Sequence, residues 1–121
     1  MAFPKHHGKN LRKGRVSQPD RIYSITTVVR QREPIFENFQ AARSLIRVLS
    51  EHEQYEYAKT LCFVVMPDHL HWLMELGNKK KLDGVIQSIK SLTSKRIGRR
   101  VWQKGFYDHA LRDEENIKNI A

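Results

Sequence analysis

Residues 60–66, Thr-Leu-Cys-Phe-Val-Val-Met, form a short continuous apolar run that is typical of a strand buried on both faces. We therefore expect a central strand here, with Cys62 as a buried thiol. Pro67 and Asp68 interrupt the run, because proline cannot donate to a strand ladder and aspartate can bond its own following backbone. Residues 69–76 form the next strand. These neighbouring strands make a sheet the framework of the predicted fold.

The remaining elements surround these strands in a regular order. Residues 22–29 are dense in β-branched and aromatic side chains, which predicts the first strand. Apolar positions three and four apart predict one helix over 35–52 and a second that begins near residue 82. Residues 101–111 predict a last strand, and the acids at 113–115 the first turn of a third helix. The order indicates an α+β fold, a mainly antiparallel sheet with helices packed on one face.

Charge points to nucleic acid as the partner. The chain carries 22 Lys and Arg against 13 Asp and Glu, a net charge of +9. Eight basic side chains lie in residues 1–32 and nine in residues 79–104, each group with a single acid. These two basic segments bracket a near-neutral or acidic body, which indicates a positive groove for a phosphate backbone. The alternative is a solvated surface that only aids solubility.

Several classes of protein are disfavoured by composition. No apolar run approaches the roughly 20 residues that a membrane-spanning helix needs. The polar, basic N-terminus lacks the apolar middle of a secretory signal. Cys62 is the only cysteine, so no internal disulfide can form. We expect a single cytoplasmic domain with no membrane partner.

The segment His69-Leu70-His71 is the strongest chemical signal in the chain. Residues two apart in a strand project to the same face, so the two imidazoles can share one ion. Such a site needs at least one further ligand and open positions for substrate oxygens. A pair of histidines on an exposed strand face, with no metal, is the alternative.

Residues 65–71, Val-Met-Pro-Asp-His-Leu-His, resemble the signature strand of the REP-associated tyrosine transposases, a branch of the His-hydrophobic-His single-strand nucleases. The segments 10–15, 23–27 and 101–112 also resemble this family. The resemblance implies a ferredoxin-like domain over residues 21–121, preceded by a flexible basic arm at 1–20. It further implies Mg²⁺ or Mn²⁺ held by His69 and His71, and cleavage of single-stranded DNA near hairpins.

The family's reaction uses a tyrosine that attacks the scissile phosphate and becomes linked to the 5′ phosphate. The phosphotyrosyl bond preserves the energy of the cleaved link, so a later 3′ hydroxyl can rejoin strands. A bound ion would polarise the phosphate and offset developing charge. Because histidine is softer than the usual oxygen ligands of Mg²⁺, we expect Mn²⁺ to bind better in vitro.

The nucleophile is where the sequence departs from the family. In relatives the tyrosine lies on the helix after the segment matching 113–115, with an amide side chain four residues later that completes the metal site. The resemblance places both beyond Ala121 and leaves the C-terminal helix incomplete. Tyr107 is the candidate substitute, although its matching family position lies in the preceding strand.

Two functions stay open: strand cleavage and transfer at REP-like hairpins, or a DNA-binding module that keeps the fold without chemistry. A structural metal site that adds Cys62 is a third reading, disfavoured by the predicted burial of Cys62.

DNA contacts are expected from both basic segments. Arg12, Lys13 and Arg15 on the arm can reach phosphates or read a guanine. Backbone contacts are expected from Lys90, Lys95, Arg96, Arg99 and Arg100. Trp102 and Phe106 could stack on unpaired bases but are more typical of a core. Asp108 and His109 could support the site, or simply form structural hydrogen bonds. The expected partner is single-stranded hairpin DNA, bound by a monomer or a homodimer.

Overall fold

A computed structural model describes residues 19–110 of the chain. Its elements are β1 (Ile22–Val28), the 3-10 turns η1 (Arg30–Arg32) and η2 (Ile35–Glu37), α2 (Phe39–Gln54), β2 (Ala58–Met66), β3 (His69–Leu76), α3 (Leu82–Ile97) and β4 (Tyr107–Ala110). Most of the predicted arm and the predicted start of a third helix fall at 1–18 and 111–121, outside the described residues.

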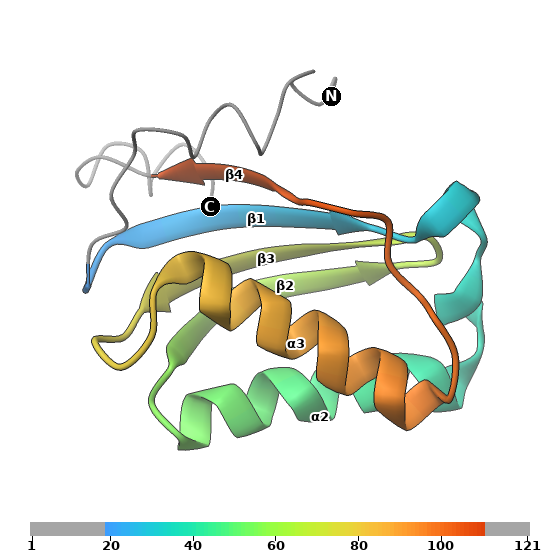
Figure 1. The fold of residues 1–121 in the computed structure, drawn as a ribbon, viewed down its shortest axis with the longest axis horizontal. Coiled ribbons are helices and arrows are strands. Elements are labelled where there is room, and N and C mark those ends of the chain that lie inside the picture. The colour runs from blue at the N-terminus through green and yellow to red at the C-terminus, as the bar shows by residue number, and fades with distance from the viewer. Residues whose placement is uncertain (1–18, 111–121) are drawn as a thin grey trace.

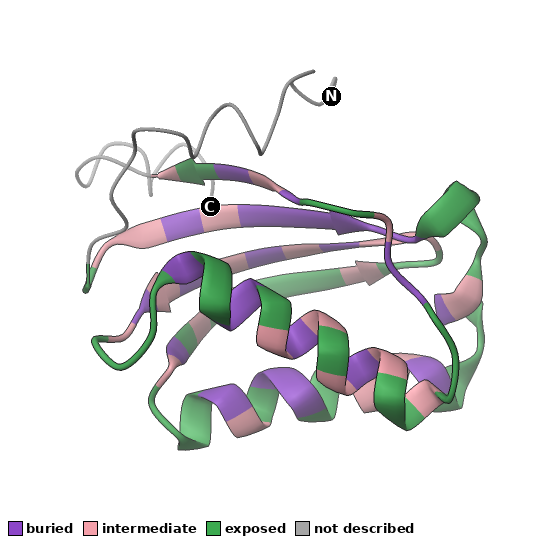
Figure 2. Ribbon diagram, in the orientation of Figure 1, coloured by how far each residue is buried: buried purple, intermediate pink, exposed green. Residues whose placement is uncertain are grey.

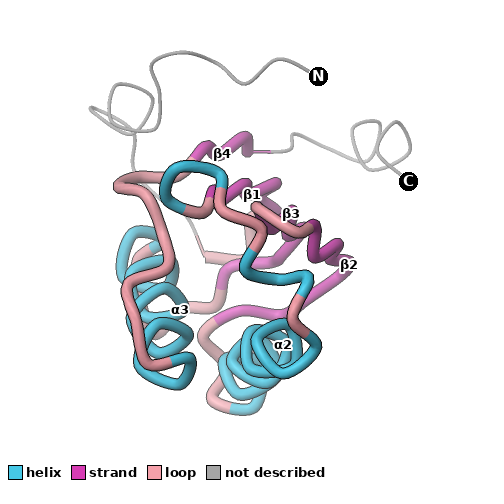
Figure 3. The backbone as a smooth tube through the Cα atoms, turned by 90° about the vertical axis from the view of Figure 1, so that its right-hand side faces the viewer, coloured by secondary structure: helices cyan, strands magenta, loops and turns pink. Residues whose placement is uncertain are grey.

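The four strands form one antiparallel sheet in the order β2-β3-β1-β4. Both helices cover the same face of this sheet (Figure 1), and the view along the strands in Figure 3 shows the sheet and the helices as two layers. Strand, helix, strand, strand, helix, strand in this sheet order is the ferredoxin-like arrangement. The predicted α+β fold class is therefore confirmed.

Buried and partly buried residues alternate strictly along β3, and this pattern shows which face of the sheet packs against the helices. Leu70, Trp72, Met74 and Leu76 are buried toward the helices, whereas the residues between them are only partly buried. The helices meet them with apolar stripes, of which Leu45 in α2 and the α3 side chains Val85, Ile86 and Ile89 are fully buried. Figure 2 shows buried residues, in purple, recurring along both helices between exposed residues in green. The other face of the sheet is left uncovered by the two helices.

The position predicted for residues 60–66 was wrong. β2 is an edge strand rather than a central one, because it pairs with β3 alone among the described residues. Most of its apolar side chains are exposed, including Leu61, Val64 and Met66, and Cys62 is exposed rather than buried. A continuous apolar run is compatible with burial on both faces, but neither a second neighbouring strand nor a cover on the open face is present in the described part.

Two predicted boundaries also differ from the structure. The first helix begins at Phe39 rather than residue 35, because the Asn38 side chain accepts a hydrogen bond from the Ala41 amide and caps the helix there. The last strand includes only Tyr107–Ala110 of the predicted 101–111. Within the preceding segment, Trp102 forms an isolated bridge with Val29 before β4 begins.

Candidate metal centre

His69 and His71 project from the face of the sheet that the helices leave uncovered. Their strand neighbours Leu70 and Trp72 are buried on the opposite, helix-covered face. The two imidazoles lie side by side, with ring centroids 4.6 Å apart and ring planes nearly perpendicular at 87°. The strand alternation that the sequence predicts therefore does place both rings together.

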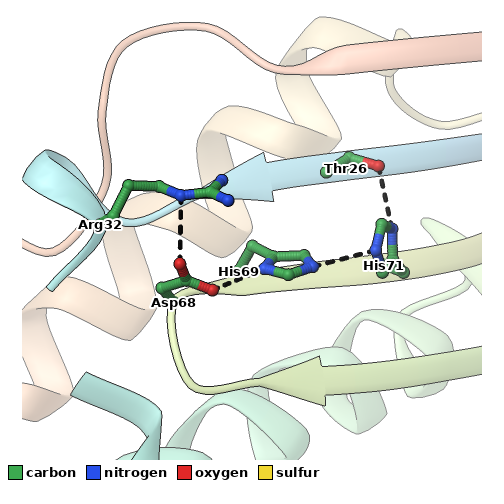
Figure 4. Close-up of polar contacts among 5 residues, drawn as sticks. All are labelled: Thr26, Arg32, Asp68, His69 and His71. Atoms are coloured by element: carbon green, nitrogen blue, oxygen red, sulfur yellow. Dashed lines mark hydrogen bonds and ion pairs between the residues drawn. The ribbon is translucent and has the colours of Figure 1, made fainter. Parts of the chain in front are cut away.

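The two Nε2 atoms converge to 3.0 Å (Figure 4). Two nitrogen ligands at right angles around one ion, each at a bond length of about 2.1 Å, would lie about 3.0 Å apart. The separation thus matches two neighbouring positions in the coordination shell of one divalent ion. The donor set of the pair fits a metal that accepts imidazole nitrogen.

Both rings are held from behind through their Nδ1 atoms. The carboxylate of Asp68 lies 2.7 Å from His69 Nδ1, and the hydroxyl of Thr26 lies 3.1 Å from His71 Nδ1. With its proton on Nδ1 and donated to Asp68, His69 directs the Nε2 lone pair toward His71. A threonine hydroxyl can donate or accept, so Thr26 accommodates either tautomer of His71. Partners of this kind orient metal-binding histidines and fix their tautomers.

Asp68 is itself fixed by the segment that follows β1. The amides of Val29 and Phe36 donate to the carbonyls of Asp68 and Pro67 respectively, both at 2.9 Å. The guanidinium of Arg32 reaches the second carboxylate oxygen of Asp68, with Nε 3.1 Å from Oδ2. Arg32 has φ of 55°, a left-handed conformation that non-glycine residues adopt at a cost of about 1–3 kcal/mol. The turn tolerates this strain while it delivers the guanidinium to Asp68.

Hydrogen bonding, charge and burial shift the pKa values of two groups at the site, Asp68 and His71. The hydrogen bond from His69 lowers the pKa of Asp68, burial opposes this shift, and the charge of Arg32 adds to it. Burial, together with the proximity of His69, lowers the pKa of His71. An unprotonated imidazole is the form that ligates metal ions, so His71 is held in the state suited to that role.

No group of three or more His, Cys, Asp or Glu side chains suited to a metal forms within residues 19–110. The burial argument against Cys62 as a metal ligand was wrong, because Cys62 is exposed. It is in register with Leu73, which lies on the same face of the sheet as the histidines. Even so, Cys62 does not form such a group with the two histidines. Any further ligands would have to be water, substrate oxygens or groups outside this range.

Comparison with protein families identifies the chain. The family model described as "Transposase IS200 like" matches residues 17–113. The chain belongs to the IS200-like transposase family. The resemblance noted from residues 65–71 is thus confirmed at the level of the family.

Individual proteins similar to this chain are also described as transposases. A Haemophilus influenzae protein described as a REP-associated tyrosine transposase is 22% identical over 116 residues, which cover 81% of this chain and 64% of the relative. The chain therefore spans less than two thirds of that relative's length. A solved structure of a REP-associated tyrosine transposase bound to a REP hairpin superposes with a TM-score of 0.74 at 17% identity, covering 99% of this chain and 68% of that one. A Deinococcus radiodurans structure described as a transposase gives 0.64 at 15% identity, covering 82% and 84%.

Tyr107, the candidate nucleophile within this IS200-like chain, lies on the same face as the histidine pair. It is in register with Thr26, which is in turn in register with His71. Two strand spacings of about 4.8 Å therefore separate the backbones of Tyr107 and His71. His109 shares this face opposite Ser24, whereas Asp108 is buried opposite Ile25 on the helix-covered side. Tyr107 and His109 stay candidates, and Asp108 lies away from the imidazoles.

Only some of the residues predicted to contact DNA lie within the described part of the chain. Arg12, Lys13 and Arg15 lie outside the described residues. In α3, the Lys90 ammonium donates to the carbonyls of Gln103 and Gly105 at 2.8 and 2.7 Å. Lys90 thus anchors the segment that leads into β4, while a role in DNA binding stays a prediction.

The other basic residues of this segment are more accessible. Arg96 pairs with Glu51 at 2.7 Å, and Arg99 forms two hydrogen bonds with Glu33, which raise the pKa of Arg99. Lys95 and Arg100 are exposed. The two aromatic candidates, Trp102 and Phe106, belong to the core cluster, as the core alternative predicted.

Sequence reasoning missed two residues that support the histidine pair. Thr26 is one of several β-branched residues in β1, and only the register with β3 places it opposite His71. Arg32 reaches Asp68 through a left-handed backbone conformation, which an arginine at that position gives no reason to expect. Asp68 was interpreted as a turn residue, and its contact with His69 adds a second role.

Within residues 19–110, no helix is both long and apolar enough to cross a membrane.

Proposed function

We propose that this chain binds hairpin DNA and holds Mg²⁺ or Mn²⁺ between His69 and His71 for strand cleavage and transfer. The observation that carries the proposal is the 3.0 Å separation of the two Nε2 atoms, combined with the carboxylate of Asp68 behind His69. Membership of the IS200-like transposase family supports the same reading.

The roles of the residues follow from their positions. A divalent ion held by the pair would polarise a phosphate oxygen and offset the charge that develops on it. Asp68 keeps the proton of His69 on Nδ1, and Thr26 holds the His71 ring in place. Both imidazoles stand on a paired central strand, so the site needs little rearrangement before it binds a ligand.

The covalent step belongs to a tyrosine. Its oxygen attacks phosphorus, the bond from phosphorus to the 3′ oxygen breaks, and that oxygen leaves as a 3′ hydroxyl after it takes up a proton. The 5′ phosphate stays linked to the tyrosine, so a later 3′ hydroxyl can reverse the step with another strand. Tyr107 is the candidate on the open face of the sheet, and the resemblance to the family favours a tyrosine beyond residue 121.

Charge and the hairpin-bound relative support the choice of DNA as partner. The net charge of +9 provides attraction to phosphate, and the solved REP-associated tyrosine transposase is bound to a REP hairpin. We expect fluorescence anisotropy to show that a labelled DNA hairpin binds more tightly than a blunt duplex of the same stem. Affinity should fall steeply with salt, because phosphate contacts release counterions. Undetectable or salt-insensitive binding would contradict the proposal.

A non-catalytic DNA-binding module is the second candidate function. It is favoured by the described residues 19–110, in which no third His, Cys, Asp or Glu joins the histidine pair in a group suited to a metal. Incubation of 3′-labelled hairpin DNA with the chain and Mn²⁺ followed by denaturing electrophoresis distinguishes the two. A protein–DNA adduct that disappears in Tyr107→Phe would establish cleavage by this chain. DNA binding without any adduct would favour the module.

A matched assay tests the role of the metal. A chimera that carries a tyrosine-bearing helix after residue 121 should give a Mn²⁺-dependent 5′ adduct, and His69→Ala should abolish it. Unchanged cleavage by the His69→Ala chimera would contradict the metal role of that histidine.

A further inference from the structure

An exposed aromatic stack lies at the end of the sheet where β3 finishes and β2 begins. The rings of Tyr55 and Tyr57 are stacked, with centroids 5.8 Å apart and an interplanar angle of 27°. Tyr57 also contacts the buried ring of His52, whereas Tyr55 is 62% exposed. The outer tyrosine therefore presents aromatic surface to solvent while the inner one ties it to the body of the protein.

Three consecutive lysines, Lys79–Lys81, border this stack. The Lys80 ammonium lies 4.6 Å from the centroid of the Tyr57 ring. Lys79 donates to the Tyr55 carbonyl at 3.1 Å and lies 3.4 Å from the Glu56 carboxylate, so only part of its charge is offset. Lys81 is exposed. We call Tyr55, Tyr57 and Lys79–Lys81 the tyrosine–lysine platform.

The platform is built from two loops that are packed in close contact. Figure 1 shows the loop from β3 to α3 beside the turn from α2 to β2. Gly77 makes this approach possible, because a Cβ at that position would lie 2.2 Å from the Glu56 carbonyl oxygen. The Gly77 amide also donates to the Tyr57 carbonyl at 3.0 Å. These contacts fix the lysines relative to the aromatic stack.

We propose that the platform binds an unpaired single-stranded DNA segment that flanks the hairpin. One base stacks on the exposed face of Tyr55, and Lys79–Lys81 contact the adjoining phosphates. Stacking on aromatic side chains combined with nearby cations is how proteins hold single strands without reading their sequence. This inference rests on the proposed function, because it assumes that hairpin DNA is the ligand.

The platform is separate from the metal centre. His69 begins β3 and Leu76 ends it, and seven residue steps of about 3.3 Å place the two ends roughly 23 Å apart. At about 3.4 Å per nucleotide step, about seven steps of a stacked strand would span that distance.

The basic N-terminal segment joins the described fold at the platform end. The Asp20 amide donates to the Leu76 carbonyl at 2.7 Å. Pro19 and the three lysines line one small cavity of about 170 Å³. The platform therefore adjoins the point at which the arm residues Arg12, Lys13 and Arg15 connect to the domain.

The test compares the same hairpin with and without an eight-nucleotide unpaired tail, placed at the 5′ or the 3′ end in separate substrates. Fluorescence anisotropy gives the affinity of the 121-residue chain, Tyr55→Ala and Tyr55→Phe for each substrate. Phe39→Ala is the matched control, because Phe39 is also an exposed ring, at 68%, but lies at the opposite end of α2.

We expect Tyr55→Ala to weaken binding of one tailed hairpin on the order of tenfold. Tyr55→Phe keeps the ring and should retain binding, and Phe39→Ala should match the unmodified chain. The tailless hairpin should bind all variants alike. Lys81→Gln should reduce the slope of log affinity against log salt by about 0.7 for the tailed substrate.

The outcomes separate this inference from the proposed function. If the unmodified chain binds tailed hairpins and Tyr55→Ala binds both of them equally well, the platform proposal is wrong while hairpin binding stands. If the unmodified chain binds no hairpin, the proposed function fails first. A tail carrying 5-iododeoxyuridine gives a direct check, since irradiation should cross-link it to Tyr55; cross-linking only to other residues would overturn the assignment.

Discussion

The two ends of β3 are organised in different ways. At the start of the strand, His69 and His71 are held by a relay of short polar contacts from Arg32, Asp68 and Thr26. At its end, exposed lysines border the exposed ring of Tyr55. The first end holds its imidazoles through paired polar groups, whereas the second carries three lysines, of which Lys79 is paired with the Glu56 carboxylate.

This difference indicates a division of labour along one strand. A metal site requires ligand atoms fixed to within about half an ångström, which the interlocked contacts around His69 provide. A surface that contacts a flexible strand tolerates looser geometry, since any base can stack and any phosphate can meet an ammonium. We therefore expect substitutions at the first end to affect metal affinity, and substitutions at the second to affect DNA affinity or local stability.

Removal of a ligand should have the largest effect. In His71→Ala only one imidazole remains, so we expect affinity for Mn²⁺ to fall by more than about 100-fold, beyond the loss caused by altering outer contacts. Isothermal titration calorimetry measures this directly. Ser24→Ala on the same face is the control and should bind Mn²⁺ normally; equal affinity in His71→Ala would disprove the two-histidine site.

Loss of the carboxylate behind His69 should have the next largest effect. Asp68→Ala removes the group that fixes the His69 tautomer, and we expect Mn²⁺ affinity to fall by about 10- to 100-fold. Glu37→Ala removes an exposed carboxylate elsewhere and serves as the control in the same titration. A similar small change in both variants would mean that Asp68 acts only through net charge.

Gly77→Ala should disturb the platform end alone. The added Cβ would clash with the Glu56 carbonyl oxygen, so we expect a loss of about 1–3 kcal/mol in the free energy of unfolding. In Gly84→Ala, the nearest atom to the added Cβ is 3.9 Å away, and α3 should gain about 0.5–1 kcal/mol. Urea denaturation gives both values, and Mn²⁺ affinity should be unchanged in each. A destabilised Gly84→Ala protein with a normal Gly77→Ala protein would contradict the packing described.

The smallest expected effect is a pH dependence at His52. This ring donates from Nδ1 to the Val48 carbonyl and contacts Ser88 Oγ through Nε2, both at 2.8 Å. Burial lowers its pKa below 6.5. The unfolded chain therefore takes up a proton more readily, and stability should fall as pH decreases through 6.5 toward the lower pKa of the folded state.

Thermal unfolding between pH 8 and pH 5 would measure this slope. His52→Gln should show a smaller loss of stability over that range, although it starts from a less stable protein. An identical slope in the two proteins would assign the pH dependence to other groups, such as His71.

Local sequence patterns predicted where the helices and strands lie better than they predicted which strands pair with one another. The alternation of residues 69–76 fixed which side chains of β3 face the helices, and the apolar spacing in α3 gave its boundaries. The apolar run at 60–66 was misplaced because the same pattern serves a central strand and this exposed edge strand. Whether a second strand pairs with β2 depends on chain topology rather than on its own residues.

The candidate site was predictable only in part. His69 and His71 follow from a spacing of two in a strand. Thr26 depends on the register between β1 and β3, and Arg32 depends on a strained turn, so neither is encoded by residues close to the histidines in sequence. The tyrosine–lysine platform likewise joins segments more than twenty residues apart through a glycine contact.

The most direct test of the metal centre is a crystal of the protein grown with Mn²⁺ and measured for anomalous scattering. The account predicts one strong peak at bonding distance from the Nε2 atoms of both His69 and His71, absent from crystals of His71→Ala. A well-ordered histidine pair without a peak at bonding distance from the two Nε2 atoms, in crystals grown at a high Mn²⁺ concentration, would contradict it.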